Sequence, residues 1–352
     1  MLTKEDLLFV RNFLNTVSSK PKSTSVMERE AAEPIVDLRI VIPCYNVEDY
    51  LERCLKSVFN QKSKYTWEVV CVNDGSSDHT GEILKTYEKY HNCTVIRQEN
   101  KGFSGARNSG MISMDCRYYM FVDADDILCE NVIEEMLQIA DQYDADMVEG
   151  NWQDFIHEEE VVLSNREEDK KIREIDSSQV SGYVWGKVIR SDMLRNIAFP
   201  ENYWYEDSIM AYLIAPQCKK IIKYEKTVYL YRRNRKGITA TGNQDVKCID
   251  TYWITEQMLD DRKKLNMPMN AKIYELFLDQ IALNYVRTMQ MNEQIKTAIF
   301  FLTVDLYGKH AMGFESPSKF HSILEKALQL GDYSLYQEGC KILWNKNCLV
   351  NK

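Results

Sequence analysis

Three acidic residues lie together in one short segment, Asp123-Ala124-Asp125-Asp126. In an extended chain the side chains at positions i and i+2 point to the same side, so Asp123 and Asp125 can face one site. Two carboxylates placed in this way offer the hard oxygen ligands that Mg²⁺ and Mn²⁺ prefer, alongside the oxygens of a diphosphate. The segment predicts a metal site, or in the simpler interpretation a solvated acidic turn before a helix that starts near Asn131.

A second acidic pair, Glu206-Asp207, follows the aromatic run Tyr203-Trp204-Tyr205. A carboxylate in such a place can act as a general base toward a substrate hydroxyl group. The pair could instead begin a helix, because the helix dipole favours carboxylates at the N-terminus. That alternative explains the acidic composition but leaves the neighbouring aromatic run unexplained.

From about Val36 onward, apolar runs of strand length alternate with segments of helical spacing. This βαβα series predicts a mostly parallel sheet covered on both faces. Such sheets bind ligands at the carboxyl ends of their strands, so polar residues after the strands should share one crevice. The expected strands are Leu38–Ile42, Glu68–Val72, Thr94–Ile96 and Tyr118–Val122, and one expected helix is Ala106–Met114. The polar segments are Pro43-Cys44-Tyr45-Asn46, Asn73-Asp74-Gly75-Ser76-Ser77-Asp78, Lys101–Arg107 and Asp123-Ala124-Asp125-Asp126.

The two ends of the chain have a different pattern. Thr3 and Asp6 have the spacing of a capping box, and apolar residues at helical spacing follow them. Residues 18–34 are polar with prolines at both ends, which predicts a linker, and residues 251–350 look mainly helical. We therefore expect an N-terminal helix and linker at 1–35, a catalytic domain at 36–245 and a helical region at 246–352.

Composition excludes several classes of protein. The 352 residues carry a formal net charge of −9, which disfavours general binding of nucleic acid. Ten cysteines without a C-x-x-C pair indicate reduced thiols rather than disulfides or a zinc site. The acidic N-terminus does not resemble a signal peptide, and no apolar run is long enough to span a bilayer. We expect a cytoplasmic protein, at the inner face of the membrane if its substrate is lipid-linked.

Taken in order, these motifs make the chain resemble the family 2 glycosyltransferases with the GT-A fold, the group that builds bacterial capsules and lipopolysaccharides. The resemblance covers about residues 38–242 and implies a Rossmann-like, nucleotide-sugar-binding α/β domain with a mostly parallel sheet. An N-terminal helix and a mainly helical C-terminal region fall outside it. The motifs are Val41–Asn46, Val72–Asp78, Gly102–Asn108, Val122–Asp126, Trp185-Gly186-Lys187 and Glu206-Asp207.

The resemblance implies a binding site for a UDP-sugar donor and a divalent metal, Mn²⁺ or Mg²⁺. Asp125 would hold the metal, and Asp123 would contact the ribose or the metal shell. Asp74 would accept a hydrogen bond from the uracil ring, although Asp74-Gly75 also has the composition of an ordinary tight turn. Pro43 and Tyr45 would line the base pocket, with a core position as the alternative for Tyr45.

Further donor contacts are implied by later motifs. Gly102 would let the backbone approach the nucleotide, and Arg107 could meet a phosphate or the ribose. Trp185 would lie near the donor and acceptor sugars, or be buried for structural reasons.

A basic stretch completes the implied donor site. In the family a stretch like Tyr229–Thr239 folds over the diphosphate, which makes Arg232 or Arg235, with Thr239, candidates for that contact. The alternative is a patch that touches anionic lipid headgroups, and both roles fit a lipid-linked acceptor.

The family resemblance implies an inverting glycosyltransferase in cell-surface polysaccharide synthesis, with Asp207 as the catalytic base. The acceptor would be a glycan or a lipid-linked glycan. One alternative is a nucleotidyltransferase, which should show a Gly-rich loop bearing Arg and Lys after the first strand, where this chain has Pro43–Asn46. A second alternative is a noncatalytic subunit that binds sugar nucleotides, which the pair Glu206-Asp207 disfavours.

Overall fold

The computed structural model describes residues 2–111, 113–156, 171–233 and 245–350. By their contacts, the residues form two compact units. We call them the sheet unit, Ser23–Asn202 with Ile209–Asn234, and the helical unit, Met1–Lys22 with Tyr203–Ser208 and Arg235–Lys352. The domain boundaries expected at residues 35 and 245 stay a prediction.

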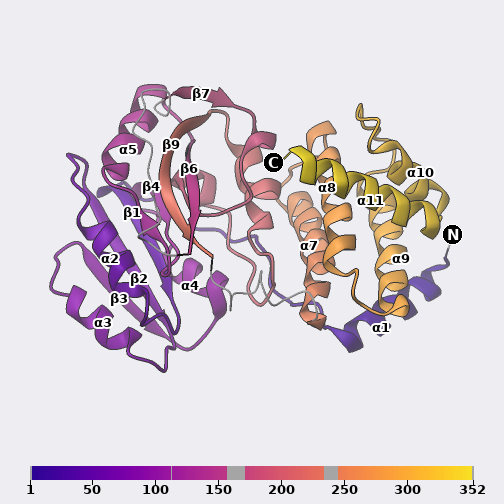
Figure 1. Cartoon of the computed structure of the whole chain (residues 1–352), viewed down its shortest axis with the longest axis horizontal. Coiled ribbons are helices and arrows are strands. Elements are labelled where there is room, and N and C mark those ends of the chain that lie inside the picture. Colours follow the sequence, from indigo (N-terminus) through magenta and orange to yellow (C-terminus); the bar gives the residue numbers. More distant parts are fainter. Residues whose placement is uncertain (1, 112, 157–170, 234–244, 351–352) are drawn as a thin grey trace. The chain divides into compact units, whose positions relative to one another are not determined.

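The first half of the sheet has the parallel arrangement that the sequence predicts. Its strands run in the order β3-β2-β1-β4, and each neighbouring pair is parallel (Figure 1). The predicted α/β fold is therefore confirmed here. The bounds are β1 Val36–Cys44, β2 Trp67–Asp74, β3 Cys93–Gln98 and β4 Cys116–Phe121.

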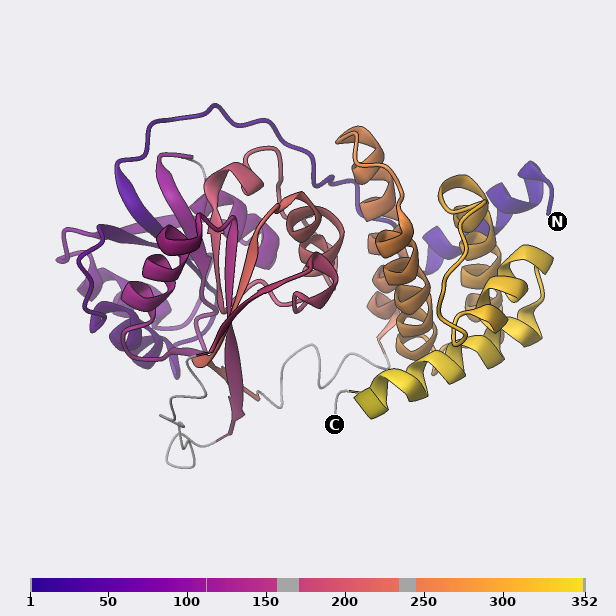
Figure 2. The ribbon, with the colours of Figure 1, turned by 90° about the horizontal axis from the view of Figure 1, so that it is seen from above.

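The second half of the sheet is mixed. It continues from β4 in the order β8-β6-β9-β5, with β7 also paired to β9. The strand β8 is antiparallel to both β4 and β6, whereas the long strands β6 and β9 run parallel side by side (Figure 2). The bounds are β5 Ile127–Leu128, β6 Met147–Phe155, β7 Ile172–Ile175, β8 Lys187–Arg190 and β9 Ile221–Arg232.

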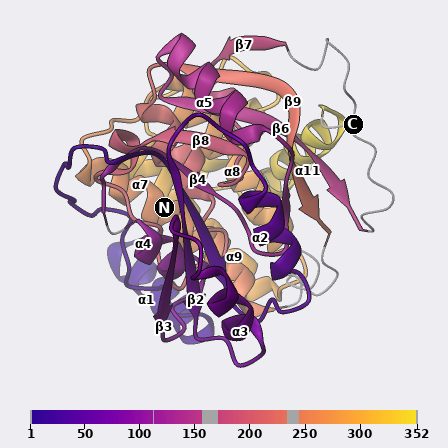
Figure 3. The same ribbon diagram turned by 90° about the vertical axis from the view of Figure 1, so that its left-hand side faces the viewer.

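Helices cover both faces of the parallel strands, as near-continuous apolar strands require. Successive residues of β2 face opposite sides: Val69 and Cys71 belong to the core under α2, α3 and α5, whereas Val70 and Val72 pack with Ala106 of α4 (Figure 3). These helices are α2 Leu51–Phe59, α3 Thr80–Tyr87, α4 Gly102–Gly110 and α5 Val132–Tyr143.

The helix α4 begins four residues before the predicted start at Ala106. Gly102 adopts φ +72°, and its N–H donates to the side chain of Asn100 at 3.1 Å. This positive φ is easily accessible to glycine, so Gly102 turns the chain directly into the helix. At the other end Gly110 allows close packing, because a Cβ there would lie 2.3 Å from a methyl carbon of Val41.

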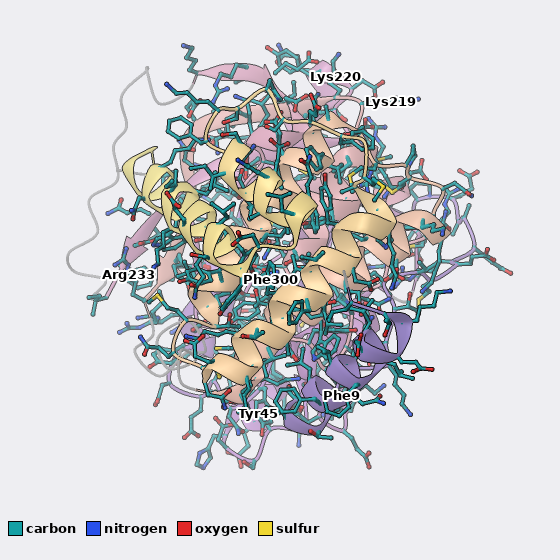
Figure 4. The ribbon with its side chains drawn as sticks, turned by 90° about the vertical axis from the view of Figure 1, so that its right-hand side faces the viewer. Phe9, Tyr45, Lys219, Lys220, Arg233 and Phe300 are labelled. Atoms are coloured by element: carbon teal, nitrogen blue, oxygen red, sulfur yellow. The ribbon has the colours of Figure 1, made fainter. Side chains whose placement is uncertain are left out.

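The helical unit contains α1 beside the C-terminal helices, and the predicted helical character of this region is confirmed. The capping box between Thr3 and Asp6 is present at the start of α1. Phe300 of α9 packs among aromatic residues of α11, whereas Phe9 of α1 is exposed (Figure 4). The bounds are α1 Lys4–Val17, α7 Asp250–Lys264, α8 Ala271–Arg287, α9 Glu293–His310, α10 Ser322–Leu330 and α11 Tyr333–Val350. None of the helices in the described ranges is both long and apolar enough to cross a membrane.

Residues 18–34 are bonded first to the helical unit and then to the sheet unit, and their role as a linker stays a prediction. In the helical unit, the carbonyl of Ser18 accepts a hydrogen bond from the Trp253 indole at 2.9 Å. In the sheet unit, Val26 forms a β-bridge with Ile197, and Arg29 donates to the carbonyl of Leu194 at 3.1 Å. Two of these contacts run from side-chain donors to backbone carbonyls and one is a backbone bridge, and a polar composition does not reveal contacts of either kind.

Candidate active site

The loops after β1 and β2 are joined by hydrogen bonds. The N–H of Asn46 donates to Ser76 Oγ at 3.1 Å, and the N–H of Ser77 donates back to Asn46 Oδ1 at 2.8 Å. Pro43 is buried at the end of β1, whereas Tyr45 is 48% exposed beside it. The exposed ring fits the predicted base contact better than a core position.

Asp74 lies at the carboxyl end of β2 with its carboxylate fixed by the protein. Its Oδ1 accepts hydrogen bonds from Gln98 Nε2 at 2.7 Å and from the N–H of Lys101 at 2.9 Å. Gly75 follows with φ +76°, and a Cβ there would lie 2.9 Å from the Asn100 nitrogen. The tight turn that the composition suggested is present, and the predicted uracil contact of Asp74 stays a prediction.

Arg107 of α4 forms an ion pair with Asp123, the residue after β4, at 3.0 Å. The guanidinium is buried and lies over the rings of Phe103 and Phe199, at 5.9 and 5.5 Å from their centres. Arg107 thus fixes the orientation of Asp123. The sequence placed both residues at one crevice but did not predict that they pair.

Asp126 is a further carboxyl of this segment that the sequence analysis left without a role. It is buried, its Oδ1 accepts the N–H of Arg232 at 2.7 Å, and its Oδ2 has no hydrogen-bond partner among the described residues. Burial, followed by the charges of Asp123 and Asp125, raises the pKa of Asp126 to about 9.

Arg232 supports the acidic segment from β9. Its Nε donates to the carbonyl of Asp125 at 2.8 Å, and its guanidinium lies 4.8 and 4.4 Å from the ring centres of Tyr50 and Phe155. Arg232 is buried, so its observed role is to hold the backbone of Asp125. The other two candidates for diphosphate binding, Arg235 and Thr239, lie outside the described residues.

The acidic segment has suitable donor chemistry for the divalent metal that the family implies. Asp123, Asp125 and Asp126 follow one another at the carboxyl end of β4, and their carboxyl oxygens are hard ligands of the kind that Mg²⁺ and Mn²⁺ prefer. Within the described ranges, no three or more His, Cys, Asp or Glu residues are grouped so that they could hold a metal alone.

An aromatic stack contacts the acidic segment after β4. Trp185 is only 4% exposed and is nearly parallel to Tyr229 and Tyr183, with ring centres 4.5 and 4.4 Å away. The hydroxyl of Tyr229 accepts a hydrogen bond from the N–H of Asp123 at 2.9 Å. Trp185 is therefore a core residue in this structure, which matches its structural alternative. The exposed ring of the stack is Tyr183, which the sequence analysis missed because exposure is decided by the fold.

The segment that carries Glu206 and Asp207 belongs to the helical unit. The N–H of Trp204 donates to Asp250 Oδ2 at 2.8 Å, and the guanidinium carbon of Arg287 lies 3.6 Å from the centre of the Tyr205 ring. Tyr205 has φ +64°, an unusual conformation for a bulky residue and one that often marks functional loops. The role of Asp207 as a base stays a proposal.

Comparison with known proteins identifies the domain around this site. Residues 39–188 match the family described as Glycosyl transferase family 2. These residues form a family 2 glycosyltransferase domain. Among curated proteins, the glycosyltransferase GlyA of Streptococcus pneumoniae is 32% identical over 57% of this chain and 31% of its own length. GlyG of the same organism is 28% identical over 58% of this chain and 73% of its own length.

A further curated relative and a solved structure resemble more of this chain. The minor teichoic acid biosynthesis protein GgaB of Bacillus subtilis is 30% identical over 65% of this chain, which spans only 26% of GgaB. Among solved structures, residues 1–349 of S. aureus TarS in complex with UDP-GlcNAc superpose with a TM-score of 0.66 at 17% identity. That match covers 87% of this chain and 90% of the TarS chain, and it shows that the fold is of the expected GT-A type.

Proposed function

We propose that this chain is an inverting, metal-dependent glycosyltransferase that uses a UDP-sugar. It would transfer the sugar to a hydroxyl group of a glycan or a lipid-linked glycan in cell-surface polysaccharide synthesis. For a lipid-linked acceptor the reaction would take place at the inner face of the membrane.

One observation carries the proposal. At the carboxyl end of β4 the carboxylate of Asp123 pairs with the guanidinium of Arg107 at 3.0 Å, and its backbone N–H donates to the hydroxyl of Tyr229 at 2.9 Å. A carboxylate fixed in this way, inside a family 2 domain and next to Asp125, is suited to ligate a cation. The names of the relatives add support, since GgaB is a teichoic acid biosynthesis protein and TarS was solved with UDP-GlcNAc.

Different residues would bind the base and the metal of the donor complex. Asp74 would accept a hydrogen bond from the uracil ring, and the exposed Tyr45 would lie against the base. Asp123 and Asp125 would hold the divalent metal, with Arg107 and Arg232 fixing their positions. When bound, the metal would supply Lewis acidity at the diphosphate leaving group.

Asp207 would take the proton from the acceptor hydroxyl. The acceptor oxygen forms its bond to the anomeric carbon on the side opposite the diphosphate, and the bond from that carbon to the diphosphate oxygen breaks. UDP leaves with the electron pair, the configuration inverts, and the proton stays on Asp207 until it is released to water. A carboxylate without a proton is required for this step.

The donor half of the proposal is tested by Asp125→Ala, with Asp192→Ala as a matched control. Asp192 is an exposed carboxylate that pairs with Arg195, three residues away, so its loss should leave the site unchanged. Calorimetry should show that Asp125→Ala removes the Mn²⁺-dependent part of UDP binding while the circular dichroism spectrum is kept. Unchanged UDP affinity in the presence of Mn²⁺ would refute the metal role.

The acceptor half is tested by Asp207→Asn, which keeps the size of the side chain but cannot take a proton. Transfer should fall by on the order of 10²- to 10⁴-fold, with UDP-sugar binding preserved. Glu206→Gln identifies the base within the pair: if Glu206→Gln abolishes transfer and Asp207→Asn does not, the base is Glu206. If neither variant affects transfer, this segment does not supply the base.

A further inference from the structure

Tyr183 presents an exposed aromatic face at the end of a buried stack. Its ring lies 4.4 Å from the Trp185 ring centre at 13° between the planes, 6.2 Å from Tyr231 and 5.3 Å from Trp152. Three aromatic rings thus fix the orientation of Tyr183, although the residue is 39% exposed. A large apolar ring held open to solvent in this way is a common feature of ligand sites.

The backbone under Tyr183 is fixed by a buried charge cluster. Lys187 is fully buried and donates to the carbonyl of Tyr183 at 2.6 Å and to Ser181 Oγ at 2.7 Å. Its ammonium group also pairs with Glu149 at 3.0 Å, and Glu149 accepts the N–H of Ser181 at 3.0 Å. The loop is thereby organised in advance, which reduces the entropy lost when a ligand binds.

A charged pair borders the exposed ring. Asp154 of β6 is the register partner of Tyr231 on β9, and its Oδ2 accepts a hydrogen bond from Arg233 Nε at 2.8 Å. The Tyr231 ring centre lies 6.2 Å from that of Tyr183, so Asp154 and Arg233 lie beside a direct neighbour of the exposed ring. Arg233 extends from the surface at the end of β9 (Figure 4). The site thus combines a flat apolar face with an exposed carboxylate and an exposed guanidinium.

We propose that Tyr183, with Asp154 and Arg233 at its edge, forms a subsite for a pyranose ring. A pyranose has an apolar face of C–H groups that matches an aromatic ring, and equatorial hydroxyl groups that match a carboxylate and a guanidinium. This inference rests on the proposed function, because the pyranose would belong to the UDP-sugar or to the acceptor glycan. A chain of contacts links the subsite to the acidic segment: Tyr183 stacks on Trp185, Trp185 stacks on Tyr229, and the Tyr229 hydroxyl accepts the N–H of Asp123.

Tyr90 offers a matched control for Tyr183. It is also 39% exposed and stacks on a core ring, with its centre 4.8 Å from that of Phe59. Tyr90 precedes β3, however, and so lies at the amino end of a parallel strand, opposite to the site. Comparing Tyr183→Ala with Tyr90→Ala distinguishes a specific effect on sugar binding from the general effect of removing an exposed tyrosine. Tyr183→Phe keeps the ring and should behave as the wild type.

The experiment measures two affinities for each variant of the full chain. In the donor arm, calorimetry with Mn²⁺ compares UDP-GlcNAc and UDP-glucose with UDP alone. In the acceptor arm, saturation-transfer NMR titrates methyl β-glucoside and methyl β-N-acetylglucosaminide, which bind without any reaction. Circular dichroism and thermal melting confirm that each variant is folded.

The proposal predicts that Tyr183→Ala lowers the affinity for the UDP-sugars or for the methyl glycosides by about threefold to tenfold. The affinity for UDP alone should stay unchanged. A loss confined to the UDP-sugars assigns the subsite to the donor, and a loss confined to the glycosides assigns it to the acceptor. Loss of glycoside binding supports the subsite even if no UDP-sugar is used, so this result is distinct from failure of the proposed function. Equal sugar affinities of Tyr183→Ala and Tyr90→Ala, or affinities of Tyr183→Ala that match the wild type in both arms, would refute the proposed subsite.

Discussion

The hydroxyl oxygen of Tyr229 accepts a hydrogen bond from the backbone N–H of Asp123 at 2.9 Å. Tyr229 is fully buried in β9, so this bond ties the metal motif after β4 to a strand more than a hundred residues later. The same ring stacks on Trp185. The position of Asp123 therefore depends on the packing of the mixed half of the sheet.

Tyr229→Phe tests this dependence. The substitution keeps the ring but leaves the N–H of Asp123 without its acceptor, which should lower the free energy of unfolding by about 1 to 3 kcal/mol. Urea denaturation measures this loss. Mn²⁺-dependent UDP affinity should fall as well, and an unchanged affinity would show that the bond does not position Asp123.

Gly75→Ala should disturb the loop after β2 for two separate reasons. The φ of +76° is costly for alanine, and the new Cβ would lie 2.9 Å from the Asn100 nitrogen. Gly313→Ala is the control, because Gly313 has φ +89° but no atom within 4 Å of the added carbon. Thermal denaturation should show a loss of about 1 kcal/mol for the control and a clearly larger loss for Gly75→Ala, which should also weaken UDP binding. Equal losses would mean that the close approach to Asn100 is unimportant.

Glu256 should make the helical unit sensitive to acid. Burial raises the pKa of Glu256, but the hydrogen bond from Arg11 and the charges of Lys20 and Arg11 outweigh it and lower the pKa to about 2. Because the pKa in the folded state lies below the ordinary glutamate value of 4.5, this stabilisation is present above about pH 4.5 and is lost as the pH falls toward 2. Glu256→Gln should cost up to about 3 kcal/mol at pH 7.

Melting temperatures of the wild type and of Glu256→Gln, measured from pH 7 to pH 3, check this prediction. The difference between the two proteins should shrink once the pH falls below about 4.5. A difference that stays constant with pH would mean that Glu256 is not stabilised in its charged form by Arg11 and Lys20.

Arg287→Met should affect transfer more than donor binding. The guanidinium of Arg287 covers the Tyr205 ring at 3.6 Å, next to the proposed base Asp207, so its loss should let that segment shift. Arg262→Met is the control, since Arg262 is another arginine of the helical unit, itself buried, that donates to the carbonyl of Pro268. We expect kcat to fall about tenfold for Arg287→Met with unchanged UDP affinity. A parallel fall for both variants would indicate a general loss of stability instead.

The local pattern of the sequence was sufficient to predict the parallel half of the sheet and the helices that cover it. The four apolar positions Leu51, Cys54, Leu55 and Val58 are all buried on one face of α2, as their helical spacing predicts. The capping box at Thr3 also formed, because it depends only on residues three apart. Such features depend only on residues within one helical turn or one strand of each other.

Features that depend on distant partners were not predictable. The burial of Trp185 and the exposure of Tyr183 follow from strands β6, β8 and β9, which are separated in sequence and mixed in direction. The pairing of Arg107 with Asp123 joins a helix to the end of a neighbouring strand. In both cases the residue types were recognised, but tertiary packing decided which of them meet.

The most direct test of the proposed function is a donor panel assayed with the purified full chain. UDP-, GDP- and dTDP-sugars are incubated with and without Mn²⁺, and released nucleotide is measured for the wild type and for Asp125→Ala. We predict that the wild type releases UDP from at least one UDP-sugar only with Mn²⁺, and that Asp125→Ala does not. Release that is equal in the two proteins, or absent for every UDP-sugar in the wild type while another nucleotide is released, would contradict a metal-dependent UDP-sugar transferase.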